Sequence, residues 1–227
     1  MYIFMMNHMT NHNIHKKINR QKNKTKRHAM EKRHFDFLME EINNTEKIGI
    51  LKFNKKLLFT LLYFTGMRLC EAISLNKNAI KAYIHDGILE IYCRKTKSYR
   101  FIYLSDITRN KFMSYFNPFT LDEFIEHIHD DGIISKYKHK VSIRTAERWF
   151  EQYTPKLYQR FGGDKSRKEW GTHSFRTNYI NQIIRAGDID KAQKVVGHKN
   201  VNTTLIYYRN LRIDDHEIMA IIDKANF

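Results

Sequence analysis

The stretch "AYIHDGILEIYCRKTKSYRFIYLS" at residues 82–105 decides the fold class, because apolar and polar residues alternate along much of its length. An alternation with a period of two is typical of β-strands that bury one face. Asp86-Gly87 is expected to form one turn and "RKTKS" at residues 94–98 another, which predicts a small antiparallel sheet. The segments on both sides change to helical spacing. We therefore expect a mainly α protein with a small antiparallel β-sheet, an α+β fold.

The helical patterns repeat apolar residues three and four positions apart. Before the sheet they cover "MEKRHFDFLMEEI", "KFNKKLLFTLLYFTG" and "MRLCEAISL". After it they cover "ITRNKFMSYF", "TLDEFIEHI", "IRTAERWFEQYTPKLYQRF", "HSFRTNYINQIIRAG", "IDKAQKVVG" and "TTLIYYR". The second helix is apolar on most faces and is expected to be central, and Gly66 suits its C-terminal end. Only Pro118 and Pro155 interrupt the later patterns.

The composition fits one large domain, or one domain with a small appendage, and a polyanionic partner. The chain has 227 residues, of which 42% are hydrophobic, and its 40 Lys and Arg against 24 Asp and Glu give a net charge of +16. Such a charge fits nucleic acid or an anionic membrane surface. The sequence has no apolar run of membrane-spanning length, and "MYIFMMNHMTNH" lacks the apolar core of a secretory signal. Cys70 and Cys93 have no disulfide or metal spacing, which is consistent with a reducing compartment.

Residues 1–29 contain no acidic side chain. Such a segment repels itself, so we expect a disordered basic arm that binds DNA phosphates, although a solvated tail is the alternative. His8, His12 and His15 lack thiol or carboxylate neighbours and are not expected to hold a metal. The basic residues of the arm are Lys16, Lys17, Arg20, Lys22, Lys24, Lys26 and Arg27.

Two arginine-bearing segments, "TGMRLCE" at 65–71 and "HSFR" at 173–176, carry the chemistry. A planar guanidinium can hold two phosphate oxygens, and two of them from different segments could clamp one phosphate. Lys95 and Lys97 lie at the hairpin tip, where an ammonium could reach a leaving oxygen, although lysines there are usually only solvated. The sequence has no glycine-rich phosphate loop of the P-loop or dinucleotide type and no metal-ligand spacing.

From about Met30 to Arg209 these segments resemble the catalytic domain of the tyrosine recombinases, the phage integrase family. "TGMRLCEAISL" is similar to the first arginine box of that family, and "HSFR" followed by "VVGHKNVNTTLIYY" is similar to the second. The family's tyrosine stands nine residues after the second histidine, which selects Tyr207 rather than its neighbour Tyr208. The resemblance implies a catalytic set of Arg68, Lys95, His173, Arg176, His198 and Tyr207, supported by Glu71.

The resemblance also implies a role for each residue type. A phenol has a pKa of about 10, so its attack on a phosphodiester needs cations near the phosphate, which the two arginines would supply. His173 would share the tyrosine proton and His198 would hydrogen-bond a phosphate oxygen. Lys95 would protonate the departing 5′ oxygen, although Lys97 is near enough to replace it. The product would be a 3′-phosphotyrosyl link that keeps the bond energy for rejoining, so we expect neither a metal ion nor ATP as a cofactor.

The implied protein is a site-specific recombinase that acts on double-stranded DNA as a homotetramer on paired sites. It would work in the cytoplasm on the nucleoid, or in the DNA-containing compartment of an organelle or infected cell. Residues 30–212 would form the catalytic domain, and residues 1–29 are too few for the core-binding domain that usually precedes it. Residues 213–227 would form a C-terminal helix that docks on a neighbouring subunit or packs on its own domain.

Two alternatives remain open. A type IB topoisomerase shares the tyrosine chemistry, but that family usually has a lysine where this chain has His173. A DNA-binding protein that keeps the fold without cutting is the other, although all six catalytic positions carry the expected residue types.

Overall fold

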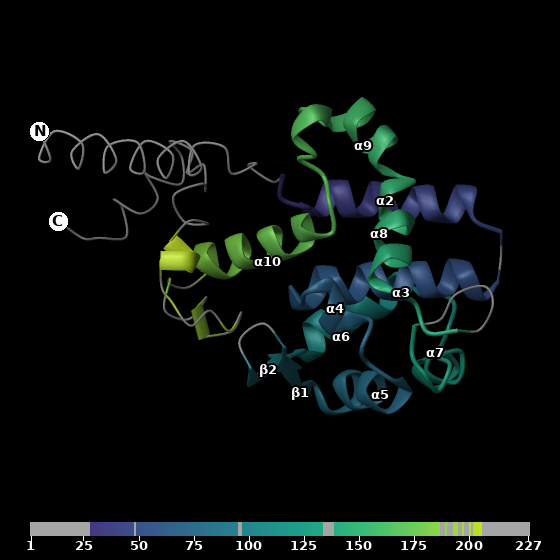
Figure 1. Cartoon of the computed structure of the whole chain (residues 1–227). Helices are drawn as coiled ribbons and strands as arrows, with labels where there is room; N and C mark the ends of the chain where they lie inside the picture. The colour runs from purple at the N-terminus through teal and green to yellow at the C-terminus, as the bar shows by residue number, and fades with distance from the viewer. Residues whose placement is uncertain are drawn as a thin grey trace, which may run out of the picture.

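The computed structural model describes residues 28–47, 49–94, 97–133, 139–186, 189, 193–194, 197, 200 and 202–205. Within them, the structure is mainly helical, with one two-stranded sheet at the edge of the helices (Figure 1), so the expected mainly α fold with an antiparallel sheet is confirmed. The elements in chain order are α2 (Lys32–Thr45), α3 (Ile50–Thr65), α4 (Leu69–Ala72), α5 (Lys77–Asp86), β1 (Ile88–Cys93), β2 (Ser98–Tyr103), α6 (Asp106–Ser114), α7 (Leu121–Glu126), α8 (Ile143–Glu151), α9 (Thr154–Phe161), the 3-10 turn η1 (Lys165–Arg167) and α10 (His173–Ala186).

Helix α3 is the centre of the core, as its apolar sequence predicted. It packs against α2, α4, α6 and α10, and its side chains Leu57, Leu58, Phe59, Leu61 and Leu62 have no exposed surface. Each such side chain contributes about 1.5–3 kcal/mol when it is fully buried. The helix is therefore a rigid base for the residues that follow its C-terminal end.

Gly66 ends α3 in the left-handed conformation, with φ of 58°, and its N–H donates to the Leu62 carbonyl at 3.1 Å. This confirms the expected helix end. A Cβ atom at this position would lie 2.4 Å from Cδ1 of Tyr179 on α10, so only glycine fits. The chain turns at once into α4, which places the end of α3, the start of α4 and the face of α10 next to one another.

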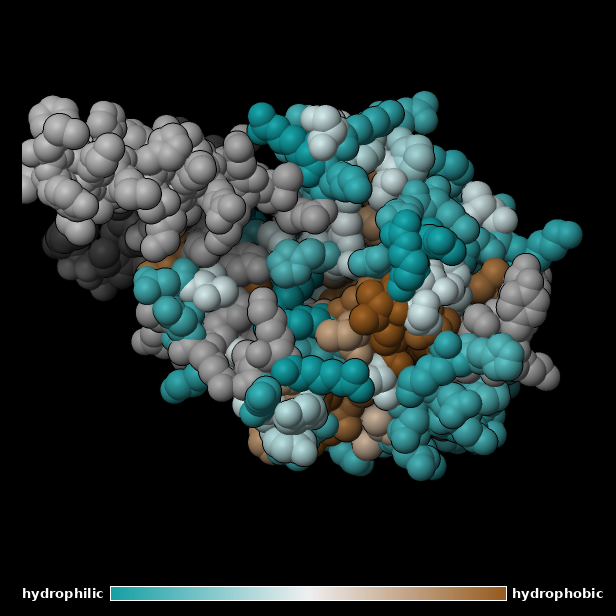
Figure 2. All heavy atoms as spheres, viewed as in Figure 1, coloured by the Kyte–Doolittle hydropathy of each residue, from teal (hydrophilic) through white to brown (hydrophobic). Residues whose placement is uncertain are grey.

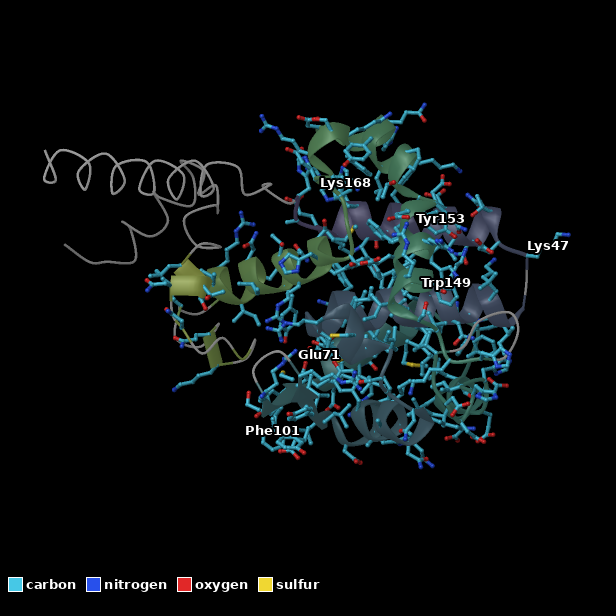
Figure 3. All side chains as sticks on the ribbon, in the orientation of Figure 1. Lys47, Glu71, Phe101, Trp149, Tyr153 and Lys168 are labelled. Atoms are coloured by element: carbon cyan, nitrogen blue, oxygen red, sulfur yellow. The ribbon has the colours of Figure 1, made fainter. Side chains whose placement is uncertain are left out.

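The two strands pair antiparallel, with Ile91 opposite Arg100 and Cys93 opposite Ser98. Their inner face is buried and includes Ile91, Cys93, Arg100 and Ile102. Their outer face is exposed and largely aromatic, with Phe101 on that side in Figure 3. An arginine therefore stands among apolar residues on the inner face of the sheet.

The expected turn at Asp86-Gly87 is wrong, because Ala82 to Asp86 are the end of helix α5 rather than a strand. The Asn76 side chain accepts from the Ala79 N–H at 2.9 Å and caps the helix. Ile80, Tyr83 and Ile84 are fully buried at helical spacing. Gly87 then ends the helix in the left-handed conformation, so the glycine marks a helix end and not a hairpin.

The face drawn in Figure 2 is mostly hydrophilic, and apolar atoms gather near its middle, around α4 and α8. A polar surface is expected for a chain with a net charge of +16. In the part of the chain that the structure describes, no helix combines the length and the apolar character needed to cross a bilayer.

Candidate active site

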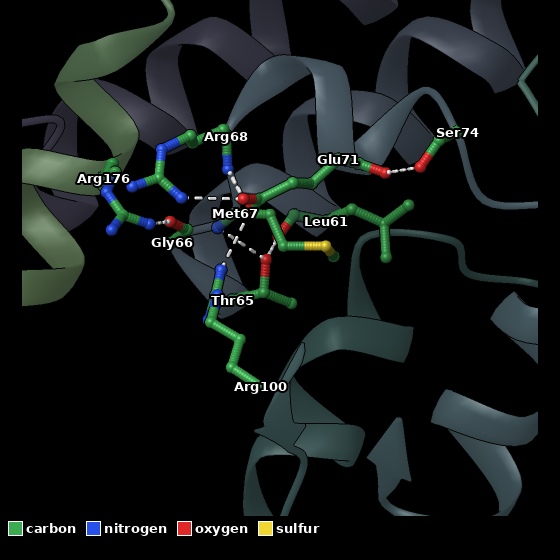
Figure 4. A network of polar contacts seen from close by, with 9 residues as sticks. All are labelled: Leu61, Thr65, Gly66, Met67, Arg68, Glu71, Ser74, Arg100 and Arg176. Carbon is green, nitrogen blue, oxygen red and sulfur yellow. Dashed lines mark hydrogen bonds and ion pairs between the residues drawn. The ribbon is translucent and has the colours of Figure 1, made fainter. Parts of the chain in front are cut away.

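Arg68 lies at the N-terminal end of α4 and is held twice by one carboxylate. Its backbone N–H donates to Glu71 Oε2 at 2.9 Å, and its Nη1 donates to Glu71 Oε1 at 2.8 Å (Figure 4). The Arg68 side chain is 20% exposed, whereas that of Glu71 is 3% exposed. Because Glu71 accepts hydrogen bonds from both the backbone and the side chain of Arg68, the direction of the Arg68 guanidinium is fixed. Part of the Arg68 side chain still faces solvent.

Glu71 also accepts a hydrogen bond from Arg100 Nη2 on β2, at 3.0 Å. Burial alone would raise the pKa of the Glu71 carboxyl, but the charge of Arg100 and the hydrogen bonds from Arg68 outweigh it and lower that pKa to about 2. Glu71 is therefore ionised at neutral pH. Figure 3 places it between the helices and the sheet, where it joins α4 to β2.

Arg176 on α10 is 2% exposed. Its Nη1 donates to the Gly66 carbonyl at 2.7 Å, although the two residues are 110 positions apart in the sequence. Gly66 is two residues before Arg68, so the arginines of the two predicted segments are anchored at the same short turn (Figure 4). We call Gly66, Arg68, Glu71, Arg100 and Arg176 the arginine cluster.

Tyr179 follows Arg176 by one helical turn and packs against Gly66. Burial raises the pKa of its phenol, although the charges of Arg100 and Arg176 act in the opposite direction. The Tyr179 ring therefore lies against the glycine whose carbonyl holds Arg176.

His173 is the first residue of α10 and is exposed. The segment before it is held by the start of the described chain, where the N–H groups of His28 and Met30 donate to the carbonyls of Glu169 and Ser174, both at 3.0 Å. The His28 ring stacks on Trp170 with a centroid distance of 4.8 Å. These contacts fix where α10 begins, and with it the position of His173.

Gly197 brings a third segment to the arginine cluster. It has φ of 66°, and a Cβ atom there would lie 2.7 Å from Cδ of Arg100. Gly197 directly precedes the predicted His198 in the sequence. Lys97 lies in the connection between β1 and β2, is exposed and has φ of 49°.

Of the predicted catalytic set, the structure therefore places Arg68, Glu71, His173 and Arg176. Lys95, His198 and Tyr207 lie outside the described residues, as do the seven basic residues of the arm and residues 213–227. Cys70 and Cys93 are free cysteines. No group of three or more His, Cys, Asp or Glu side chains within the described ranges could hold a metal ion.

The sequence reasoning missed Arg100 and the role of the Gly66 carbonyl. A signal for Arg100 was available, because strand alternation puts it on the same face as Ile102, and an arginine on a buried strand face needs a partner. No comparable signal exists for the Gly66 carbonyl, since its partner comes from a distant helix.

Comparisons with known proteins show the family and the fold of the chain. The profile of the phage integrase family matches residues 28–213. The tyrosine recombinase XerC of Rickettsia bellii (strain OSU 85-389) is 26% identical over 170 residues, which are 74% of this chain and 50% of that protein. The chain thus spans about half the length of this curated relative.

Two solved structures share the fold. The XerH site-specific recombinase bound to palindromic difH substrate, in a post-cleavage complex, has a TM-score of 0.61 and 19% identity over 88% of this chain and 53% of that chain. The Tn1549 transposon integrase in complex with transposon right end DNA has a TM-score of 0.59 and 13% identity over 86% of this chain and 65% of that chain. Because the family match covers most of the chain and both arginine segments, the chain belongs to the phage integrase family of tyrosine recombinases.

Proposed function

We propose that this protein is a site-specific recombinase that cuts and rejoins double-stranded DNA through a 3′-phosphotyrosyl intermediate. Family membership and the net charge of +16 support the DNA substrate. Two proteins of the same fold, the XerH recombinase and the Tn1549 integrase, were solved as complexes with their substrate and with transposon DNA.

The observation that carries the proposal is the joint anchoring of Arg68 and Arg176. Glu71 holds the first guanidinium at 2.8 Å, and the Gly66 carbonyl holds the second at 2.7 Å. Two arginines on separate elements, brought to one turn, suit a dianionic phosphorane-like transition state, because each can donate two hydrogen bonds to oxygens of one phosphate.

The chemistry assigned to the remaining residues is what the resemblance to the tyrosine recombinases implies for each. Tyr207 attacks the phosphorus atom, and its proton passes to His173. Lys95 donates a proton to the 5′ oxygen that leaves, and His198 donates a hydrogen bond to a non-bridging oxygen. One phosphodiester becomes one phosphotyrosyl ester and a free 5′ hydroxyl, so the reverse attack of a 5′ hydroxyl can rejoin a strand.

The proposed assembly is a tetramer on two paired DNA sites, in the compartment that holds the DNA. Residues 1–29 act as a basic arm on phosphates, residues 30–212 as the catalytic domain, and residues 213–227 as a helix that docks on a neighbouring subunit. This division follows the charge and apolar patterns of the sequence.

The experiment uses nicked duplexes taken from inverted repeats in the DNA that flanks the gene. A nick near the cleavage position releases the 5′ fragment after cutting, so a covalent protein–DNA product accumulates and survives denaturing electrophoresis. We expect such a product. Its absence on all flanking repeats, together with intact DNA binding, would support a binding protein without cleavage.

A second experiment distinguishes a recombinase from a topoisomerase. A recombinase should join two intact duplexes into a synaptic complex, whereas a topoisomerase acts on one duplex.

A further inference from the structure

Arg100 is buried at the junction of three segments of the site. Its side chain is 5% exposed, and it comes from β2, directly after the hairpin connection that contains Lys97. Its Nη2 donates to Glu71 Oε2 at 3.0 Å. Its Cδ lies so near Gly197 that a Cβ atom on this glycine would be only 2.7 Å away. The same side chain thus touches the first arginine segment and the residue before His198.

Glu71 divides its two oxygens between Arg68 and Arg100. Oε1 accepts from Arg68 Nη1 at 2.8 Å, while Oε2 accepts from the Arg68 backbone at 2.9 Å and from Arg100 at 3.0 Å. A carboxylate with both oxygens engaged has one favoured orientation. When Arg100 is removed, Oε2 loses its charged partner and the carboxylate can turn, which changes where Oε1 holds the Arg68 guanidinium.

We infer that Arg100 is a positioning residue of the active site: through Glu71 it sets the direction of Arg68, and by its packing it holds Gly197 beside the first arginine segment. The inference rests on the proposed function. Arg100 does not need to touch DNA for this role, because its side chain is buried against Glu71 and Gly197. It acts on the reaction through the groups that it holds.

The central variant is Arg100→Met, which keeps the length of the side chain and removes its charge. We expect the rate of covalent product formation at saturating nicked DNA to fall by about 10- to 100-fold, because small misplacements of positioned groups cost that much. The dissociation constant for DNA should remain unchanged. Arg100→Lys keeps the charge on Glu71 and should recover part of the rate.

The matched control is Arg109→Met. Arg109 also joins elements around the sheet, with Nη2 on the His85 carbonyl at 3.0 Å and Nη1 on Asp106 at 2.9 Å, but it lies outside the arginine cluster. It should leave the cleavage rate unchanged at temperatures where the protein is folded. The inference would be overturned if Arg100→Met and Arg109→Met lost the same cleavage rate, or if Arg100→Lys recovered none of it. Arg100 would then be a general stabilising contact.

A second measurement does not depend on cleavage. Hydrogen exchange of backbone amides should become faster at Met67 and Arg68 and in β1 and β2 of Arg100→Met, and should be unchanged at Met67 and Arg68 in the control. If the wild-type protein forms no covalent product, the proposed function fails while this exchange pattern still supports the mechanical role of Arg100. Unchanged exchange in Arg100→Met would contradict that role even in an active enzyme.

Gly197 gives an independent test of the third contact. Gly197→Ala should slow cleavage because the added methyl group displaces Arg100, and it should slow cleavage much less when Arg100 is already methionine. Such a double-mutant cycle measures the coupling between the two residues. Additive effects would mean that Gly197 acts on the reaction without Arg100.

Discussion

Gly66 and Glu71 fix the two arginines from the two ends of one short turn. The Gly66 carbonyl is directed at Arg176 because the residue takes the left-handed conformation that ends α3. Five residues later the Glu71 carboxylate reaches back to Arg68. The geometry of the arginine cluster thus depends on one backbone conformation and on one charged side chain, and each can be tested alone.

Replacement of Gly66 by alanine should damage both stability and the site. The new Cβ atom would lie 2.4 Å from the Tyr179 ring, and overpacking of this kind costs roughly 1–3 kcal/mol. Because Tyr179 or Gly66 must move, Arg176 loses its acceptor position and cleavage should slow. Urea unfolding and the rate of covalent product formation would measure the two effects.

Gly162→Ala is the control for that variant. Gly162 also has a positive φ, of 74°, but a Cβ atom there would have no neighbour within 4 Å. It carries a backbone penalty without a clash near the site, so the cleavage rate of the folded protein should be unchanged. A Gly66→Ala protein that cleaves as fast as this control would show that the Gly66 carbonyl does not position Arg176.

Glu71 should make stability depend on pH in acid. Its pKa is lowered from 4.5 to about 2 in the folded protein, so its contribution is fully present above about pH 4.5 and is lost as the pH falls toward 2. A shift of this size corresponds to ~3 kcal/mol. The free energy of unfolding, measured in urea, should therefore differ between wild type and Glu71→Gln at neutral pH, and the difference should shrink below about pH 4.5. A difference that stays constant with pH would mean that the carboxylate is not held by its arginines.

Among the elements, the segment from His28 to Met30 links the start of the described chain to the segment before α10. The His28 ring stacks on Trp170, and its Nε2 lies 2.9 Å from a carboxylate oxygen of Glu169. The preceding residues therefore join the domain at the segment that leads into His173.

Deletion of residues 1–27 should weaken binding about equally for all DNA sequences, since the phosphate backbone carries no sequence information. The slope of log affinity against log salt should flatten by roughly 0.9 for each phosphate that the arm neutralises in the intact protein. As a control, neutral replacements of Arg144 and Lys156, on α8 and α9, should leave the slope unchanged, because both pair with glutamates. An unchanged slope after the deletion would exclude binding of the arm to DNA.

Periodicity predicted the elements whose burial follows a local pattern. Helix α3 and strands β1 and β2 were predicted because their apolar spacing matches the faces that they bury. Asp86-Gly87 was predicted as a hairpin turn, but the structure shows a helix end there. An Asp-Gly dipeptide is compatible with both, and the burial of Tyr83 on the helix favours the helix end. The hydrogen bond from Arg176 to Gly66 could not be predicted from spacing, since it depends on how α10 packs on α3.

In the molecule as a whole, the arginine cluster joins the central helix α3, the sheet and α10. A displacement of any of these elements would therefore also move the arginines. We propose that residues 213–227, which lie outside the described residues, couple neighbouring subunits through such a displacement. Truncation after Arg212 should leave binding to a single site intact and abolish complexes on paired sites. Native gels and light scattering with DNA would show this. Complexes of normal size from the truncated protein would assign the segment to its own domain.

The most direct test of the proposed chemistry is to identify the residue that carries the DNA in the trapped covalent product. Protease digestion and mass spectrometry should find the 3′-phosphate on Tyr207. Tyr207→Phe should form no covalent product while it binds DNA normally, and the matched variant Tyr208→Phe should form the product at a rate near that of wild type. DNA attached to Tyr208 or to any other residue, or a covalent product from Tyr207→Phe, would contradict the account.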